Sequence, residues 1–96
     1  MKIKQFVFNA FSENTYIIYD DTKACIIIDP GCYDADERNL LTAFIEDNSL
    51  NVVTLINTHC HIDHVLGNSF VKRTYGVELL IHKEDIPTLK ANEMVA

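Results

Sequence analysis

Hydrophobic positions in the first third of the chain form short β-branched and aromatic runs, which are typical of strands. The runs span residues 3–11, 15–19 and 24–28, and the third is rich in isoleucine. The polar residues 20–23 between the second and third runs predict a hairpin turn. Asp29-Pro30-Gly31 then ends the third run, because proline has no amide hydrogen for a strand ladder and glycine frees the backbone.

Helical spacing replaces this pattern in the middle of the chain. Apolar side chains recur there on one helical stripe: Leu40, Leu41, Phe44 and Ile45. Acidic residues precede the stripe, where negative charge stabilises a helix N-terminus, and Asn48-Ser49 ends it. The pattern then predicts a buried strand over 52–56, a helix over 65–75 closed by Gly76, and a buried strand over 77–81.

The predicted order is three strands, a helix, a strand, a helix, a strand and a last helix from residue 83 onward. Apolar strands combined with helices indicate an α/β (α+β) fold, in which a sheet is covered by helices. No repeat, low-complexity segment or linker divides the 96 residues. We expect one partial domain over 1–96, because the chain ends without a stop signal or a terminal strand, as if cut inside a larger fold.

Composition and charge narrow the classes of function. The formal net charge is −6, from 14 acidic and 8 basic residues, whereas a nucleic-acid footprint needs a basic stripe or patch. No run approaches the roughly 20 apolar residues of a membrane span. Three cysteines without CxxC spacing favour reduced thiols. We therefore expect a cytoplasmic protein with a small-molecule substrate and with neither nucleic acid nor a membrane as partner.

The chemistry of the chain is concentrated in the segment Thr58-His59-Cys60-His61-Ile62-Asp63-His64. In an extended segment residues i and i+2 point to the same side, so His59 and His61 can share one metal ion. The chain then turns, and Asp63 and His64 can face the same cleft from the next helix. Imidazole nitrogen and carboxylate oxygen are good zinc ligands. We expect a catalytic centre of one or two ions, with zinc as the default and iron or manganese as alternatives.

The segment 58–64, with Gly67-Asn68 after it, resembles the metallo-β-lactamase superfamily, whose pattern is S/T-H-x-H-x-D-H followed by Gly or Gly-Asn. The upstream stretches 13–18 and 27–31 are similar to the glyoxalase II branch, which comprises hydroxyacylglutathione hydrolases and related small zinc hydrolases. The resemblance covers nearly the whole chain. It implies the N-terminal half of an αββα sandwich, which is a mixed sheet with helices on one face.

The resemblance also implies a role for each residue of the motif. His59 and His61 would bind a first metal ion, and Asp63 and His64 a second. A metal-bound hydroxide would attack a carbonyl group, because coordination lowers the pKa of water to about 7. Asp63 would be the catalytic residue, orienting this nucleophile or managing its proton. The expected activity is that of a zinc hydrolase, with thioester hydrolysis suggested by the branch, and this chain carries only part of the site.

Three further side chains have structural interpretations beside functional ones. Asp29 either caps its turn or orients a ligating histidine. Cys60 alternates with the two histidines of the motif and is expected to pack under the loop. His82 matches no ligand position of the family pattern and is interpreted as structural.

Two alternatives stay open. The family completes both metal sites with ligands further along the chain, and none follows His64 here. The chain would then be a non-catalytic half-domain that binds metal structurally or not at all, and that self-associates as a homodimer through its exposed sheet face. A second alternative places His59 and His61 at the end of a barrel strand, as in amidohydrolase-type enzymes. Adjacent Asp63-His64 and the three leading strands weigh against it.

Overall fold

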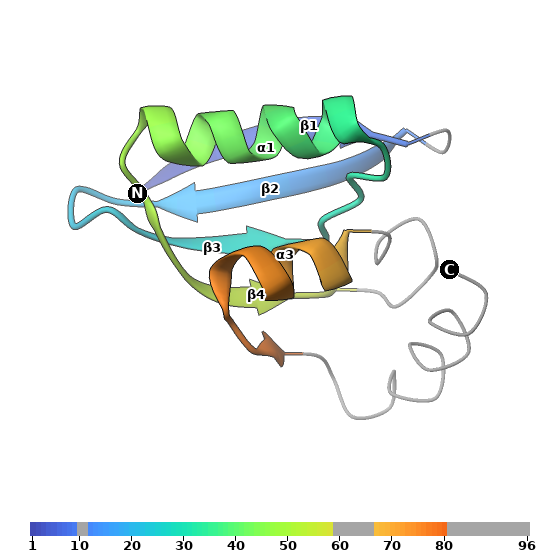
Figure 1. The fold of residues 1–96 in the computed structure, drawn as a ribbon. Helices are drawn as coiled ribbons and strands as arrows, with labels where there is room; N and C mark the ends of the chain where they lie inside the picture. Colours follow the sequence, from blue (N-terminus) through green and yellow to red (C-terminus); the bar gives the residue numbers. More distant parts are fainter. Residues whose placement is uncertain (10–11, 59–66, 81–96) are drawn as a thin grey trace.

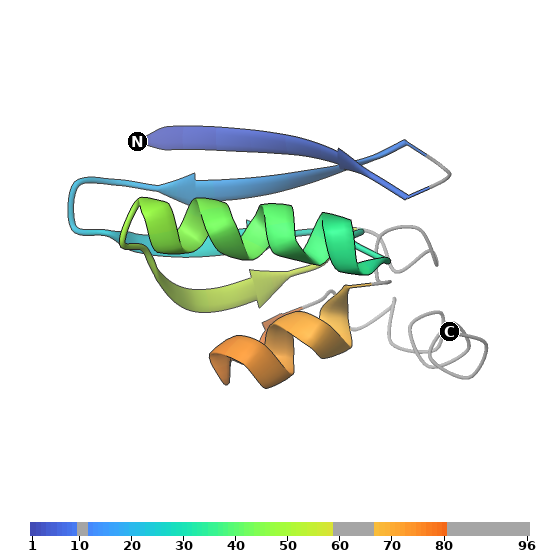
Figure 2. The same ribbon diagram turned by 45° about the horizontal axis from the view of Figure 1, so that its top comes forward.

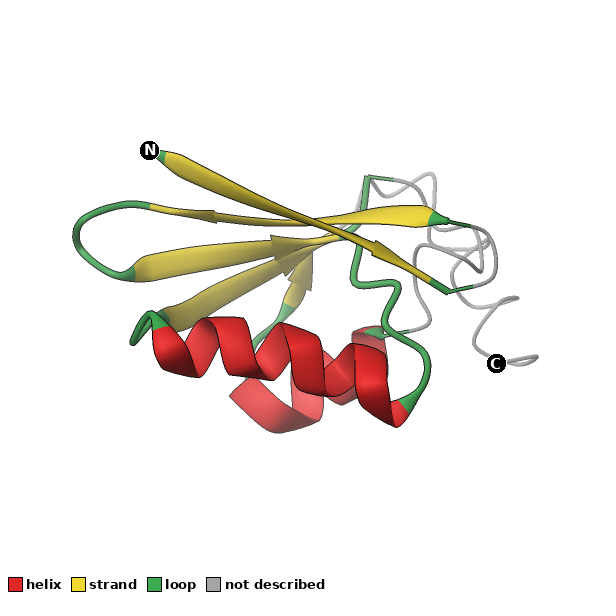
Figure 3. Cartoon of the chain, turned by 90° about the horizontal axis from the view of Figure 1, so that it is seen from above, coloured by secondary structure: helices red, strands yellow, loops and turns green. Residues whose placement is uncertain are grey.

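A five-stranded mixed sheet with helices on one face organises the computed structural model of this chain, which describes residues 1–9, 12–58 and 67–80 (Figure 1). In chain order the elements are β1 (Lys2–Phe8), β2 (Glu13–Tyr19), β3 (Ala24–Ile28), α1 (Ala35–Asp47), β4 (Asn51–Ile56), α3 (Asn68–Tyr75) and β5 (Leu79–Leu80). The strand order is β1-β2-β3-β4-β5. The β1–β2 and β2–β3 pairs are antiparallel, and the β3–β4 and β4–β5 pairs are parallel. Both helices lie against the same face (Figures 2 and 3). The predicted fold class is confirmed.

The predicted elements that fall on the described residues are confirmed in type, with differences at their ends. The first strand ends at Phe8, because Asn9 takes a positive φ of 57° that leaves the extended region. The last strand begins at Leu79 rather than at Val77, since the chain needs the preceding residues to turn back from α3, and Ile81 lies outside the described residues. The helix predicted over 65–75 is described from Asn68 onward. The helix expected from residue 83 onward lies outside the described residues.

The turn between β2 and β3 is closed by the side chain of Asp20. Its carboxylate accepts hydrogen bonds from the hydroxyl of Thr22 at 2.5 Å and from the backbone N–H of Thr22 at 2.9 Å, and these bonds lower the pKa of Asp20. Lys23 adopts a φ of 72°, and its N–H donates to the Asp20 carbonyl at 3.0 Å. The predicted hairpin is therefore built by an Asx-type turn.

The core lies between the sheet and the two helices. The strands contribute buried side chains from their helix-facing positions, and the helices contribute three more: Phe8, Ile17, Cys25, Ile27, Val52 and Leu55 from the strands, and Leu41, Ile45 and Val71 from the helices. A shift in the β3–β4 register allows both Val52 and Leu55 to be buried, although they are three residues apart. Among the described residues, no helix has the length and apolar character needed to cross a membrane.

The start of α1 is joined to the loop between β1 and β2. Asp34 caps the helix by accepting the N–H of Glu37 at 2.8 Å. The two carboxylate oxygens of Glu37 accept the N–H of Asn9 at 2.6 Å and the N–H of Tyr33 at 2.9 Å. The acidic first turn predicted from the sequence is confirmed, and it also holds two loops together at one edge of the sheet.

The sheet face opposite the helices carries apolar side chains in rows across the strands. The register aligns Ile3, Ile18 and Ile26 in one row, and Tyr16, Ile28, Ile56 and Leu80 in the next. Ile3 is 64% exposed and Leu80 is 54% exposed. No helix of the described residues covers this face (Figure 3). We call it the open face.

Neighbouring leucines on α1 provide a matched test of this packing. Leu41 is fully buried, whereas Leu40 is 58% exposed. We expect Leu41→Ala to lower the free energy of unfolding by about 2–5 kcal/mol, because it removes buried methyl groups and leaves a cavity. Leu40→Ala should change it by less than about 0.5 kcal/mol. Urea denaturation of both variants measures the difference, and equal effects would contradict the burial described here.

Candidate metal centre

The structure describes both flanks of the predicted metal-binding segment but not the segment itself. The four predicted ligands lie outside the described residues: His59, His61, Asp63 and His64. Cys60 and His82 lie outside them too. Within residues 1–9, 12–58 and 67–80, no group of three or more His, Cys, Asp or Glu side chains is placed to hold a metal ion. The ligand assignment therefore stays a prediction, and the flanks show how the fold holds the segment.

The upstream flank is held by Asp29, which follows β3. Its backbone N–H donates to the carbonyl of Ile56 at 2.8 Å, so the turn stays attached to β4. One carboxylate oxygen accepts the backbone N–H of Thr58 at 2.7 Å, and the other accepts the Thr58 hydroxyl. Asp29 is 4% exposed and adopts a φ of 53°, a conformation that aspartate tolerates better than most residues. The carboxylate is thus hydrogen-bonded twice to Thr58, the residue directly before His59.

These contacts bear on the two interpretations of Asp29. The bonds from Thr58 to the Asp29 carboxylate show a structural role, because they attach the turn of Asp29 to the residue between β4 and the motif. A contact with a ligating histidine would involve residues outside the described ones and stays a prediction.

A buried threonine fixes the turn that carries Asp29. The hydroxyl of Thr15 lies 2.7 Å from the carbonyl oxygen of Asp29 and 3.0 Å from a carboxylate oxygen of Glu13. The same hydroxyl accepts the N–H of Gly31 at 2.9 Å. Thr15 is fully buried and Glu13 is 3% exposed. The strand β2 therefore holds the turn through side-chain chemistry as well as through the sheet ladder.

The downstream flank approaches the same turn so closely that only glycine fits. The N–H of Gly67 donates to the carbonyl of Pro30 at 2.7 Å. A Cβ atom on Gly67 would lie 2.6 Å from Cys32 Sγ and 2.7 Å from the Pro30 oxygen. The φ of Gly67 is −96°, so close approach rather than a left-handed backbone explains this glycine.

A reciprocal pair of side-chain amides joins the two flanks. Asn57 Nδ2 donates to Asn68 Oδ1 at 3.1 Å, and Asn68 Nδ2 donates to Asn57 Oδ1 at 2.7 Å. Asn57 is 4% exposed and Asn68 is 5% exposed. Sequence reasoning missed Asn57, because an asparagine after a strand is ordinarily a turn residue. Asn68 was noted only as part of the Gly-Asn pattern. The sequence does not show that Asn57 and Asn68 are buried and paired across the motif.

The cysteines of the described region are unsuited to metal binding at neutral pH. Cys25 and Cys32 are free and buried. Burial raises the pKa of Cys25 to about 11 and that of Cys32 to about 12. A thiol must ionise to bind zinc, so both remain protonated core residues, and Cys32 serves as the surface against which Gly67 packs.

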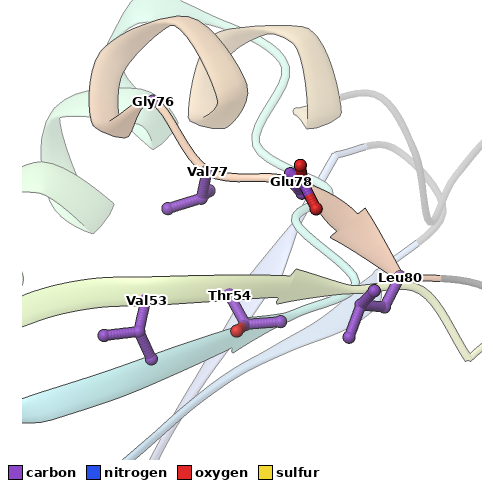
Figure 4. Close-up of a pocket in the computed structure, with 6 residues that line it drawn as sticks. All are labelled: Val53, Thr54, Gly76, Val77, Glu78 and Leu80. Atoms are coloured by element: carbon purple, nitrogen blue, oxygen red, sulfur yellow. The ribbon is translucent and has the colours of Figure 1, made fainter.

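A cavity of about 330 Å³ opens at the β4–β5 edge of the sheet and is lined by Val53, Thr54, Gly76, Val77, Glu78 and Leu80 (Figure 4). Of the described residues that line it, Glu78 alone is titratable. One carboxylate is too small a donor set for a catalytic metal ion, which takes about three protein ligands. The described lining therefore does not by itself form a metal centre.

Three comparisons with known proteins give the family and the fold of this chain. The family model of the metallo-beta-lactamase superfamily matches residues 9–95. The hydroxyacylglutathione hydrolase GloC of Haemophilus influenzae is 39% identical over 79 residues, which cover 82% of this chain and 35% of GloC. The chain thus spans about a third of the length of this curated relative.

Solved structures show the same fold. The BLEG-1 B3 metallo-beta-lactamase superimposes with a TM-score of 0.77 at 28% identity, over 86% of this chain and 38% of that one. TTHA1623, solved in a di-iron-bound form, gives a TM-score of 0.80 at 24% identity, over 97% of this chain and 44% of that one. The second likeness supports the fold alone.

Replacing Asp29 tests the upstream flank. We expect Asp29→Asn to lower the free energy of unfolding by about 1 kcal/mol, because the bonds to Thr58 lose their charged acceptor while the amide can still accept the Thr58 N–H and donate to its hydroxyl. Asp21→Asn, at an exposed turn position, should change it by less than about 0.5 kcal/mol. Chemical denaturation compares the two variants. An Asp29→Asn variant as stable as Asp21→Asn would show that the contact with Thr58 contributes nothing.

Proposed function

Because this chain belongs to the metallo-beta-lactamase superfamily, we propose that its segment 59–64 supplies the first part of a hydrolase metal centre. His59 and His61 would hold one ion, and Asp63 and His64 a second. One observation carries the proposal. Both ends of the segment are fastened to the same turn, Thr58 to Asp29 and Gly67 to Pro30.

The donor chemistry fits a borderline metal ion. Imidazole nitrogens and one carboxylate suit zinc, and they also suit iron and manganese. When bound, the metal would polarise a carbonyl group and activate water at neutral pH. Asp63 would then hold or accept a proton beside the substrate.

The segment supplies fewer metal ligands than a catalytic centre needs. A catalytic zinc site uses about three protein ligands and leaves a position open for water, whereas the segment offers two donors for each ion. We propose that the remaining ligands come from further parts of a longer protein. The relation to GloC, about a third of whose length this chain spans, supports that arrangement.

The proposed reaction is hydrolysis of a small-molecule thioester in the cytoplasm. The likeness to the hydroxyacylglutathione hydrolase of Haemophilus influenzae supports the substrate class. The free thiols of Cys25 and Cys32 support a reducing compartment.

Metal binding by paired histidine variants tests the proposal. We expect His61→Ala to weaken Zn²⁺ binding by the chain at least about 10-fold, because it removes one of two ligands to an ion. His82→Ala, outside the motif, should leave the affinity unchanged. Equilibrium dialysis followed by elemental analysis measures both. Turnover of S-lactoylglutathione by the longer protein should disappear on chelation and return with metal. Equal zinc binding by the two variants would contradict the ligand assignment.

A second candidate function is a non-catalytic half-domain that self-associates, and the open face favours it. Its two rows of apolar side chains cross β1 to β3 and β2 to β5, so together they cover all five strands. Contiguous exposed apolar surface of this kind marks interaction sites in soluble proteins. A homodimer formed through this face would bury Ile3 and Leu80, which are more than half exposed in the single chain.

Substitutions on the open face separate the two candidates. If the half-domain self-associates, the double variant Ile3→Lys/Leu80→Lys should raise the dimer dissociation constant at least about 100-fold, because it would bury two charges at the interface. Leu40→Lys, equally exposed but on α1, should leave it unchanged. Sedimentation at several protein concentrations measures this. A stable metal-free dimer without turnover favours the half-domain, and a monomer at all concentrations contradicts it.

A further inference from the structure

The amide pair of Asn57 and Asn68 lies in an unusual place for two polar side chains. Both residues are about 95% buried, yet each amide donates to the other. Two apolar side chains of similar size would fill such a site without needing partners. Buried polar pairs are therefore weak contributors to stability, and their best-attested use is to specify one arrangement out of several.

The pair completes a set of three connections across the motif. Thr58 is bonded to Asp29, and Gly67 is bonded to Pro30, the next residue along the same turn. These two connections fix the flanks to the turn. The reciprocal amides instead connect the flanks directly to each other, from the end of β4 to the first residue of α3.

The amide pair differs from the other two connections because it fixes an orientation as well as a distance. A single hydrogen bond allows rotation about its axis, whereas two antiparallel bonds between planar amides fix the plane of each group. The backbone N–H of Asn57 is also bonded to the carbonyl of Leu80 at 3.1 Å, which attaches Asn57 to β5. The start of α3 is therefore fixed against the sheet in orientation as well as in distance.

We infer that Asn57 and Asn68 are positioning residues for the metal ligands. The pair holds the residues on either side of the segment 59–66 in one relative orientation, which lowers the loss of chain entropy when donors of the segment bind an ion. The inference rests on the proposed function, because it assigns a role toward the same metal ions. Partners that orient metal ligands typically change metal affinity by about 10–100-fold when they are removed.

Three variants of the 96-residue chain test this role with Zn²⁺ as the probe. Asn68→Leu should weaken Zn²⁺ binding about 10–100-fold in chelator competition. It should also lower the denaturation midpoint of the metal-free chain, since the amide of Asn57 is left buried without its partner. Asn39→Leu, on the exposed side of α1, is the matched control and should change neither quantity.

The double variant Asn57→Leu/Asn68→Leu separates positioning from stability, and it serves also if the single variant fails to fold. It leaves neither amide of the pair unpartnered, so it should recover most of the denaturation midpoint. Its Zn²⁺ affinity should remain at least about 10-fold below that of the wild type.

Each other outcome is decisive. Wild-type affinity in the double variant, or a loss of stability in Asn68→Leu with unchanged affinity, would overturn the positioning role alone. A wild-type chain that binds no Zn²⁺ would overturn the proposed function and this inference together.

Discussion

The carboxylate of Asp29 on Thr58 is the contact on which the arrangement of this chain depends. It joins the turn after β3 to the end of β4, at the edge where these parallel strands finish side by side. Thr15 holds that turn from β2, and Gly67 reaches it from the start of α3. A buried carboxylate needs partners for its oxygens, and Thr58 supplies them from the end of β4, while β2 and the start of α3 are attached to the backbone of the same turn.

The local parts of the fold could be predicted from the sequence, because their causes are local. Asp20 and Asp34 act on backbone groups two or three residues away, so the hairpin and the start of α1 follow from residue type. Partners distant in the chain could not be predicted. Asn57 and Asn68 each have an ordinary local interpretation, and only folding brings them together. The motif itself was identifiable, whereas its geometry depends on residues outside the described ones.

The two proposed functions rest on neighbouring regions of the molecule, which share the backbone of Ile56 and Leu80. The metal framework lies at one end of the sheet, where the β3 and β4 strands finish and the residues around Asp29 and Asn57 are buried. The open face extends across all five strands on the side away from the helices. A partner on that face would lie beside Ile56 and Leu80, whose carbonyls accept the N–H groups of Asp29 and Asn57. Association and metal binding should therefore be measured together in one chain.

The order of the strands has a consequence for how the molecule is made. Each strand from β2 onward pairs with the strand directly before it in the sequence. The two antiparallel pairs join neighbouring strands through short connections. The parallel pairs instead bring together residues that are far apart in the chain, Cys25 with Val52 and Leu55 with Leu79, and such pairing forms more slowly. The bonds that join Thr58 to Asp29 and Asn68 to Asn57 link residues 29 and 11 positions apart, so they need both parallel strands and the start of α3 to be in place.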